Sequence, residues 1–205
     1  IRNLDYYPAA IAAFISFSLL SSMAYLVNDI LDRHQDRLHP EKQWRPIAAG
    51  RISPETALIA ATVVGIAGLL IAFIANVALG AAALVYVLLT AAYSLRLKHV
   101  FLVDVAVIAL GFAIRAIAGA FAINVPASPW LIGCTFLLSL FLALNKRRHE
   151  CLLFEETDDR RRASLAGRKT ALLTAASFLT AAATLVLYTL YTVIGPLDTP
   201  LLILT

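Results

Sequence analysis

The chain has 205 residues, of which 60% are hydrophobic and 15% are charged, and its formal net charge is +4. A soluble domain usually carries about 25% charged residues, so the composition argues against a soluble helical bundle and favours a helical membrane protein. Alternating strand patterns are absent, which argues against a membrane β-barrel. No interleaving of basic and aromatic residues indicates nucleic-acid binding.

Six long apolar stretches follow one another along the chain, and each approaches or exceeds the roughly 20 residues that a helix needs to cross a bilayer. We therefore expect an all-α, polytopic transmembrane helical bundle that forms a single domain over residues 1–205. The first residue is Ile rather than Met, and we expect the chain to be incomplete at one or both ends. The predicted spans are 9–28, 54–75, 78–95, 101–123, 129–145 and 171–194.

Basic residues gather in alternate connections between these spans. The connections at 29–51, 96–99 and 146–170 hold most of the 17 Lys and Arg residues, whereas those near 76–79, 124–128 and 195–200 hold none. The positive-inside rule then predicts a multi-pass protein of the cytoplasmic (inner) membrane with the three basic connections in the cytoplasm. Anionic lipid headgroups or phosphate ligands are the partners that such loops favour.

Local signals mark the ends of several helices. Ser53, Pro54 and Glu55 read as the N-cap and first turn of the second span, and Asn76 marks a tight turn after it. Frequent Gly and Ala within the spans would let neighbouring helices approach closely. The charged segment 155–170 reads as a flexible cytoplasmic loop, with a lid over a substrate as the alternative.

An acidic cluster follows the first span. Asn28, Asp32 and Asp36 are spaced four residues apart, so at about 100° per residue they fall nearly on one helix face. Asp29 lies one residue off this row and three residues before Asp32. Carboxylates so close repel one another unless a cation neutralises them, and oxygen ligands without Cys or His select a hard cation such as Mg²⁺. We predict that these four residues bind the metal, with the three aspartates as catalytic residues.

Two cations follow the acidic cluster directly. Lys42 and Arg45 can reach back over this helix end, where a metal-bound diphosphate would need counter-charge. Membrane anchoring by the positive-inside rule explains them equally well.

The pattern N-D-x-x-D-x-x-x-D in NDILDRHQD resembles the signature of the UbiA superfamily of intramembrane prenyltransferases. Three blocks, in order along the chain, are most similar to its decaprenyl-phosphate phosphoribosyltransferase branch. They are NDILDRHQDRLHPEKQWRPIAAGRISPE, YSLRLKHVFLVDVAVIALGFAIRAIAGAFA and LALNKRRHE. The resemblance implies a bundle of about eight or nine spans, of which six are visible here.

The sequence departs from the superfamily at the end of the fifth span. Ordinary members carry a second aspartate-rich motif there, whereas this chain has the basic residues Lys146, Arg147 and Arg148. A cluster of cations suits a phosphate monoester, such as the head of a polyprenyl phosphate or the 5-phosphate of a ribosyl donor. One more positive-inside cluster is the alternative interpretation.

Further substrate contacts are predicted from the second block. Arg115 lies in the middle of a span, where a charge is costly unless it faces a cavity or a partner. Tyr93 and Lys98 match a YS-x-x-LK block of the family that this chain resembles, and the resemblance implies that Lys98 contacts a phosphate. Asp104 could pair with Lys98 or Arg115, or line a polar cavity.

Together these features predict a membrane-embedded transferase whose active site faces the cytoplasm. It would move 5-phosphoribosyl from phosphoribosyl diphosphate to a polyprenyl phosphate, with Mg²⁺ as cofactor. A prenyltransferase acting on an aromatic acceptor is the first alternative, and the missing second acidic motif counts against it. A transporter or lipid-binding protein, with the acidic row as an ion site, is the second. A homo-oligomer is compatible with either kind of protein.

Overall fold

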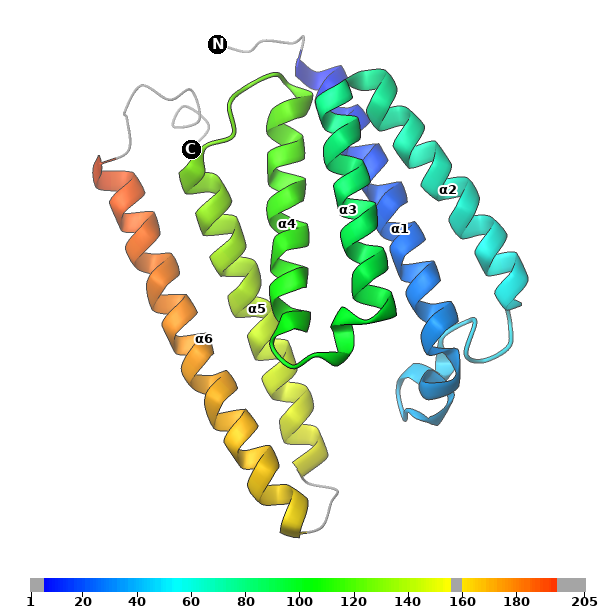
Figure 1. Ribbon diagram of the computed structural model, residues 1–205, viewed down its shortest axis with the longest axis vertical. Helices are drawn as coiled ribbons and strands as arrows, with labels where there is room; N and C mark the ends of the chain where they lie inside the picture. Colours follow the sequence, from blue (N-terminus) through cyan, green and yellow to red (C-terminus); the bar gives the residue numbers. More distant parts are fainter. Residues whose placement is uncertain (1–5, 156–159, 195–205) are drawn as a thin grey trace. The chain divides into compact units, whose positions relative to one another are not determined.

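The computed structural model describes residues 6–155 and 160–194, which fold into six long helices with two short 3₁₀ helices between them (Figure 1). Each long helix is apolar enough and long enough to cross a membrane. The all-α transmembrane bundle predicted from the sequence is thereby confirmed. In chain order the elements are α1 (Tyr6–Leu38), η1 (Lys42–Trp44), α2 (Pro54–Ala75), α3 (Val77–Leu95), η2 (Leu97–His99), α4 (Val103–Ala122), α5 (Pro129–Glu155) and α6 (Arg160–Ile194).

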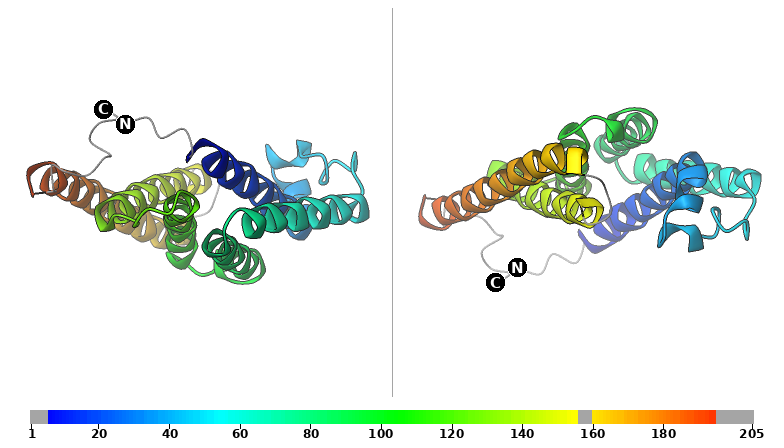
Figure 2. Two further views of the ribbon diagram at one scale, coloured as in Figure 1. Left: turned by 90° about the horizontal axis from the view of Figure 1, so that it is seen from above. Right: turned by 90° about the horizontal axis from the view of Figure 1, so that it is seen from below.

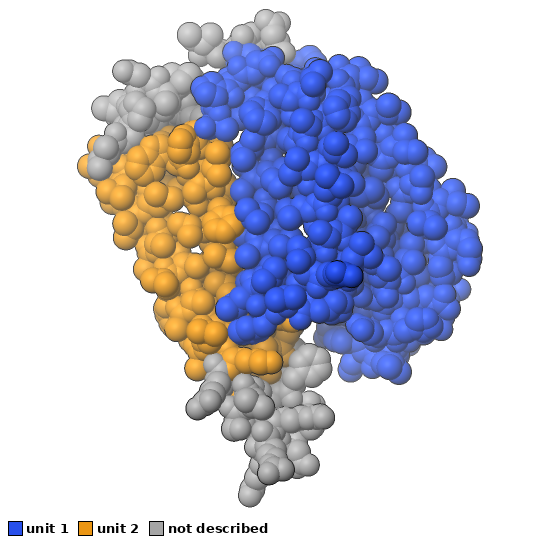
Figure 3. Space-filling view, viewed as in Figure 1, with its two compact units in different colours: residues 1–127 blue, residues 128–205 orange. Residues whose placement is uncertain are grey.

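The chain divides into two compact units, coloured separately in Figure 3. Unit 1 covers residues 1–127 and holds α1 to α4 with both 3₁₀ helices, while unit 2 covers residues 128–205 and holds α5 and α6. Each unit is described below by itself, and the single domain expected over residues 1–205 stays a prediction.

Within unit 1, α1 and α2 pack closely because small residues line their contact. The Ser16 hydroxyl is fully buried and donates a hydrogen bond of 2.8 Å to the Gly68 carbonyl. A Cβ atom added at Gly68 would lie 2.9 Å from Leu20 Cγ, and one added at Gly65 would lie 2.7 Å from Met23 Sδ. The two glycines therefore set the distance between the helices, as expected for transmembrane packing.

The core of unit 1 lies where α1, α3 and α4 meet. The Phe17 and Tyr86 rings pack edge to face with centroids 5.4 Å apart, and the Tyr86 hydroxyl shares a hydrogen bond of 3.1 Å with the Ser21 hydroxyl. The Tyr86 hydroxyl thus has a hydrogen-bond partner, without which its burial in an apolar interior would be unfavourable. The buried cluster around it comprises Ala13, Phe17, Leu20, Ala72, Leu79, Ala82, Ala83, Tyr86, Ala118 and Ala122.

The two connections with 3₁₀ helices lie at the same end of unit 1 as the C-terminus of α1 (Figure 1). Seen from below, in the right view of Figure 2, residues 39–53 lie beside that end of α1. The Arg37 guanidinium Nε donates a hydrogen bond of 2.8 Å to the Ala48 carbonyl, and the side chains of Ile47 and Ala48 are buried. The loop is therefore fastened to the helix that carries the acidic cluster.

Unit 2 is a pair of helices, α5 and α6. The Trp130 and Tyr191 rings lie 6.3 Å apart near one end of the pair. The prediction that residues 155–170 form a flexible loop is wrong over most of its length, because α5 runs to Glu155 and α6 begins at Arg160. Arg, Ala, Leu and Lys are strong helix formers, so the part of the charged run from Arg160 onward belongs to α6.

Candidate active site at the end of α1

Asn28, Asp29, Asp32 and Asp36 all lie on the last turns of α1, where the apolar part of the helix gives way to a polar end. Their side chains are not fully in water: Asp36 is 6% exposed, Asp32 19% and Asp29 24%. Carboxylates held this far from solvent need compensating charge or hydrogen bonds.

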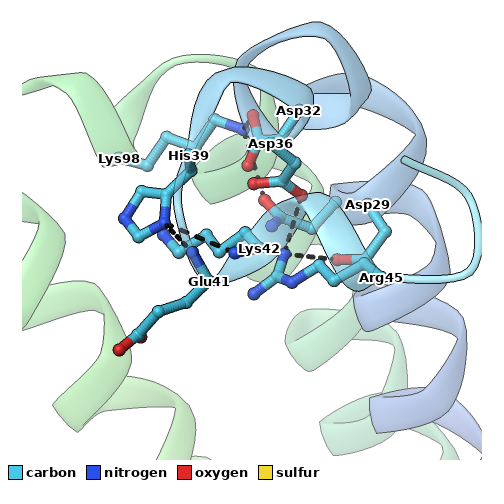
Figure 4. Close-up of polar contacts among 9 residues, drawn as sticks. Asp29, Asp32, Asp36, His39, Glu41, Lys42, Arg45 and Lys98 are labelled. Carbon is cyan, nitrogen blue, oxygen red and sulfur yellow. Dashed lines mark hydrogen bonds and ion pairs between the residues drawn. The ribbon is translucent and has the colours of Figure 1, made fainter. Parts of the chain in front are cut away.

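Arg45 supplies that charge to two of the aspartates (Figure 4). Its Nη1 donates hydrogen bonds to Asp29 Oδ1 at 2.7 Å and to Asp36 Oδ2 at 2.9 Å. Arg45 follows η1 directly, so the loop after α1 turns back and places a guanidinium over the helix from which it came. The sequence allowed Arg45 to reach back over this helix end, and the structure shows it bound there.

Lys98 supplies the charge to the third aspartate. Its Nζ forms an ion pair with Asp32 Oδ1 and donates a hydrogen bond of 3.2 Å to Asn28 Oδ1. Lys98 comes from η2, the connection between α3 and α4, so segments separated by about 70 residues meet here. The Lys98 side chain is only 11% exposed.

The four oxygen-bearing residues therefore form two pairs rather than one row. Asp29 and Asp36 are seven residues apart, which is about 20° short of two full turns, so their side chains point in nearly the same direction. The Arg45 guanidinium therefore reaches both carboxylates. Asn28 and Asp32 are about 40° apart and lean toward η2. The sequence analysis put Asp29 one residue off the row. In the structure Asp29 and Asp36 share Arg45 as a partner, just as Asn28 and Asp32 share Lys98.

The loop that carries Arg45 is held by its own hydrogen bonds. The His39 Nδ1 accepts from the backbone N–H groups of Glu41 and Lys42 at 3.2 Å and 3.4 Å, as drawn in Figure 4. Arg51 donates to the Trp44 carbonyl at 2.7 Å. The Lys42 ammonium forms no hydrogen bond or ion pair with the described part of the chain, so it is available to a ligand.

The donor set fits a hard cation, although the residues are not gathered around one point. Every candidate ligand on α1 offers oxygen, which is what Mg²⁺ prefers. Within residues 6–155 and 160–194, no three His, Cys, Asp or Glu side chains lie close enough together to hold a metal ion by themselves. Arg45 and Lys98 occupy the carboxylates instead, and the assignment of metal ligands stays a prediction.

A pocket of about 200 Å³ opens beside the Asp32–Lys98 pair. Besides these two residues it is lined by Leu31, Gln35, Ser94, Leu95 and His99. The sequence analysis missed Gln35, although this residue follows Asp32 by three residues and so shares its helix face. Ser94 is the serine of the block YS-x-x-LK, but the sequence analysis assigned it no role of its own.

Two further predicted contacts lie elsewhere in unit 1. The Arg115 guanidinium lies over the Phe112 ring, 5.6 Å from its centroid, on α4, and its side chain is exposed. Tyr93 is half-buried near the end of α3, and Asp104 is buried in the first turn of α4. Their roles as substrate contacts stay predictions.

The second basic cluster lies on α5 in unit 2. Arg147 Nη1 donates a hydrogen bond of 3.0 Å to Glu150 Oε2, while Lys146 is exposed. The Nε of Arg148 is buried and finds no hydrogen-bond acceptor among the described residues. A buried guanidinium N–H without a partner is costly, and a phosphate oxygen would satisfy it.

Comparison with known proteins gives three consistent findings. The model of the UbiA prenyltransferase family matches residues 3–205. Decaprenyl-phosphate phosphoribosyltransferase of Mycolicibacterium smegmatis is 37% identical over 179 residues, which are 87% of this chain and 56% of that protein. The protein of the same name from Mycobacterium tuberculosis is 40% identical over 153 residues, which are 75% of this chain and 51% of that protein.

A solved structure shows the same fold. It is that of a UbiA homolog from Archaeoglobus fulgidus bound to DMAPP and Mg²⁺, which matches with a TM-score of 0.75 at 19% identity. The match covers 88% of this chain and 65% of the archaeal one. This chain spans about half the length of the curated relatives that it matches.

Proposed function

The chain belongs to the UbiA prenyltransferase family and is an integral membrane protein, and on that premise we propose that it transfers 5-phosphoribosyl from phosphoribosyl diphosphate to a polyprenyl phosphate. The enzymes named decaprenyl-phosphate phosphoribosyltransferase, at 37% and 40% identity, support this choice of substrates. The observation that supports it most is the chemical contrast between the acidic cluster on the last turns of α1 and the basic cluster at residues 146–148 of α5.

The end of α1 offers what a diphosphate and its metal need. Mg²⁺ held by Asn28, Asp29, Asp32 and Asp36 would neutralise the charge that grows on the leaving diphosphate. Arg45 and Lys98 bind these carboxylates in the free protein, and phosphate oxygens would offer both cations new partners. Lys42 adds a third cation, from the same loop as Arg45.

The basic cluster of α5 offers what a second, metal-free phosphate needs. Lys146, Arg147 and Arg148 stand where acids would suit a second metal, and the buried Nε of Arg148 has no hydrogen-bond acceptor among the described residues. A polyprenyl phosphate held there would be ionised at neutral pH and would need no general base. Arg115, on α4 of unit 1, is proposed as a phosphate contact on its own account, because a charge within a span is costly without a partner.

In the transfer itself, an oxygen of the polyprenyl phosphate attacks the anomeric carbon of the ribosyl group. The bond between that carbon and the diphosphate oxygen breaks, and diphosphate leaves with the electron pair. Direct attack inverts the anomeric carbon, so an α-linked donor gives a β-linked product. Placing the site at the cytoplasmic face of the cytoplasmic membrane follows from the basic connections at that end of unit 1.

The test supplies purified protein and Mg²⁺ with two substrate mixtures. One contains labelled phosphoribosyl diphosphate and decaprenyl phosphate, and the other contains labelled prenyl diphosphate and aromatic acceptors. We expect label to enter lipid in the first mixture. If product forms in the second mixture alone, the proposed function is wrong and the protein is a prenyltransferase. DMAPP, which is bound in the archaeal structure, is a prenyl diphosphate of the kind used in that mixture.

Asp32 is the residue on which both enzyme functions depend most. Replacing it by Asn removes the charge but keeps a hydrogen-bond acceptor for Lys98, so we expect a folded protein with turnover lowered by about 100-fold or more. Glu55→Gln is the matched control, because Glu55 is an exposed acid in the first turn of α2. Turnover of Asp32→Asn equal to that of the control would remove Asp32 from this role.

A further inference from the structure

The pocket beside the Asp32–Lys98 pair contains polar side chains to which the transfer described above assigns no role. We propose that Ser94, Gln35 and His99 form the subsite that binds the hydroxylated ring of the donor, next to its diphosphate. The inference rests on the proposed function, because it assigns residues that distinguish a ribosyl donor from a prenyl donor.

Ser94 is the strongest part of this subsite. The residue is 5% exposed, yet its hydroxyl forms no hydrogen bond with any residue that the structure describes. Other hydroxyls on the same helices do bond to the backbone one turn earlier, as Thr90 does to the Tyr86 carbonyl at 2.9 Å. The Ser94 hydroxyl is therefore free to donate to and accept from a ligand hydroxyl or phosphate oxygen that enters the pocket.

Gln35 and His99 face the same pocket from two other elements. Gln35 lies on α1, one turn after Asp32, and His99 follows Lys98 in η2. Both side chains are exposed and form no hydrogen bond with the described residues. An amide and an imidazole each provide a donor and an acceptor, which is the combination that sugar hydroxyls need.

The chemistry of these groups selects the class of donor. A ribosyl ring carries two free hydroxyls, and three hydrogen-bonding side chains around a pocket of about 200 Å³ can pair with them. A prenyl chain offers no hydrogen bond, so in this pocket it would displace water from the Ser94 hydroxyl and the Gln35 amide without replacing the lost hydrogen bonds. Displacing bound water in this way weakens binding, which favours the donor that carries hydroxyls.

The first experiment measures binding to the full chain, purified in detergent with Mg²⁺, by titration calorimetry. The ligands are phosphoribosyl diphosphate and inorganic diphosphate, which differ by the ribosyl 5-phosphate group. We expect Ser94→Ala and Gln35→Ala each to weaken phosphoribosyl diphosphate binding by about 3- to 10-fold and to leave diphosphate binding unchanged. Ser22→Ala and His34→Ala are the controls, since neither residue lines the pocket.

The second experiment changes the ligand rather than the protein. Ribose 5-phosphate and 2-deoxyribose 5-phosphate compete with labelled phosphoribosyl diphosphate for the wild type and for Ser94→Ala, Gln35→Ala and His99→Ala. We expect the wild type to prefer the ribose by about 3- to 10-fold and at least one variant to lose that preference. This comparison remains informative where a variant is less stable, because both competitors meet the same protein.

The outcomes separate the two proposals. If the wild type binds phosphoribosyl diphosphate and all three variants keep its affinity and its preference for ribose, the subsite is wrong and the proposed function stands. If the wild type binds geranylgeranyl diphosphate but not phosphoribosyl diphosphate, the proposed function fails and the subsite fails with it.

Discussion

Arg45 joins two carboxylates of the candidate active site, and its removal gives the sharpest test of how that site is held together. In Arg45→Ala, Asp29 and Asp36 lose their shared partner at 2.7 Å and 2.9 Å. Asp36 suffers more, because its side chain is only 6% exposed and cannot regain water easily. We expect the variant to be less stable than the wild type in the absence of metal.

The size of the effect follows from the exposure of the three groups. Breaking a fully buried ion pair costs about 3–5 kcal/mol, and an exposed pair contributes about 0–1 kcal/mol. The Arg45 side chain is 37% exposed and that of Asp29 is 24% exposed, so the loss belongs between these limits. A cost of about 2 kcal/mol corresponds to a fall in the unfolding midpoint of about 4–8 °C for a chain of this size.

Thermal unfolding in detergent, with and without Mg²⁺, measures this cost. Removing Arg45 frees carboxylate oxygens, so millimolar Mg²⁺ should raise the midpoint of Arg45→Ala more than that of the wild type. Arg51→Ala is the matched control, because Arg51 lies in the same loop and its side chain, among the described residues, donates to the Trp44 carbonyl and to no carboxylate. A midpoint for Arg45→Ala equal to that of the control, or no added stabilisation by Mg²⁺, would refute the reasoning.

Two further predictions concern the packing of unit 1, and thermal unfolding in detergent checks both. Gly68→Ala should destabilise the protein by about 1–3 kcal/mol because its Cβ would lie 2.9 Å from Leu20 Cγ. Gly119→Ala, which meets no atom within 4 Å on α4, should not be destabilising; equal losses in the two variants would contradict this account. Asn76→Ala should cost about 1–2 kcal/mol, since Asn76 caps α3 through the Ala78 N–H at 2.7 Å. Asn76→Ser keeps a capping oxygen without placing a carboxylate against the Phe121 carbonyl and Asn124 Oδ1, which accept from the Asn76 amide, and should recover part of the loss; no recovery would show that the cap contributes little.

The helical spans were predictable because apolar length is a direct consequence of the bilayer. The sequence placed the first span at 9–28, and α1 indeed covers it, but the helix continues to Leu38. Membrane thickness limits the apolar stretch and not the helix itself, so charged turns can extend beyond the bilayer where water solvates their side chains. The same reasoning explains why α5 and α6 reach into the segment expected to be a loop.

The sequence identified the acidic residues of the candidate site, but it did not identify which cation pairs with which carboxylate. Spacing along one helix identified Asn28, Asp32 and Asp36, but the partners of these groups come from two connections whose paths no spacing rule defines. Arg45 reaches Asp29 and Asp36 because Ile47 and Ala48 are buried and fasten the loop. Long-range packing of this kind depends on the whole bundle and cannot be read from a local pattern.

Acidic and basic side chains lie close together at the end of α1 because they neutralise one another. Asp29, Asp32 and Asp36 face Arg45 and Lys98, with Lys42 nearby, so the formal charges at this helix end nearly cancel. Under the proposed function, a metal ion alone would compete with Arg45 and Lys98 for the same oxygens, and a diphosphate alone would meet three carboxylates. If both bound together, the carboxylates could hold the metal while Arg45 and Lys98 paired with phosphate oxygens. Metal and diphosphate should therefore strengthen each other's binding by the same factor. Arg45→Ala should weaken that coupling, because the variant binds the metal more readily but has lost a partner for the diphosphate.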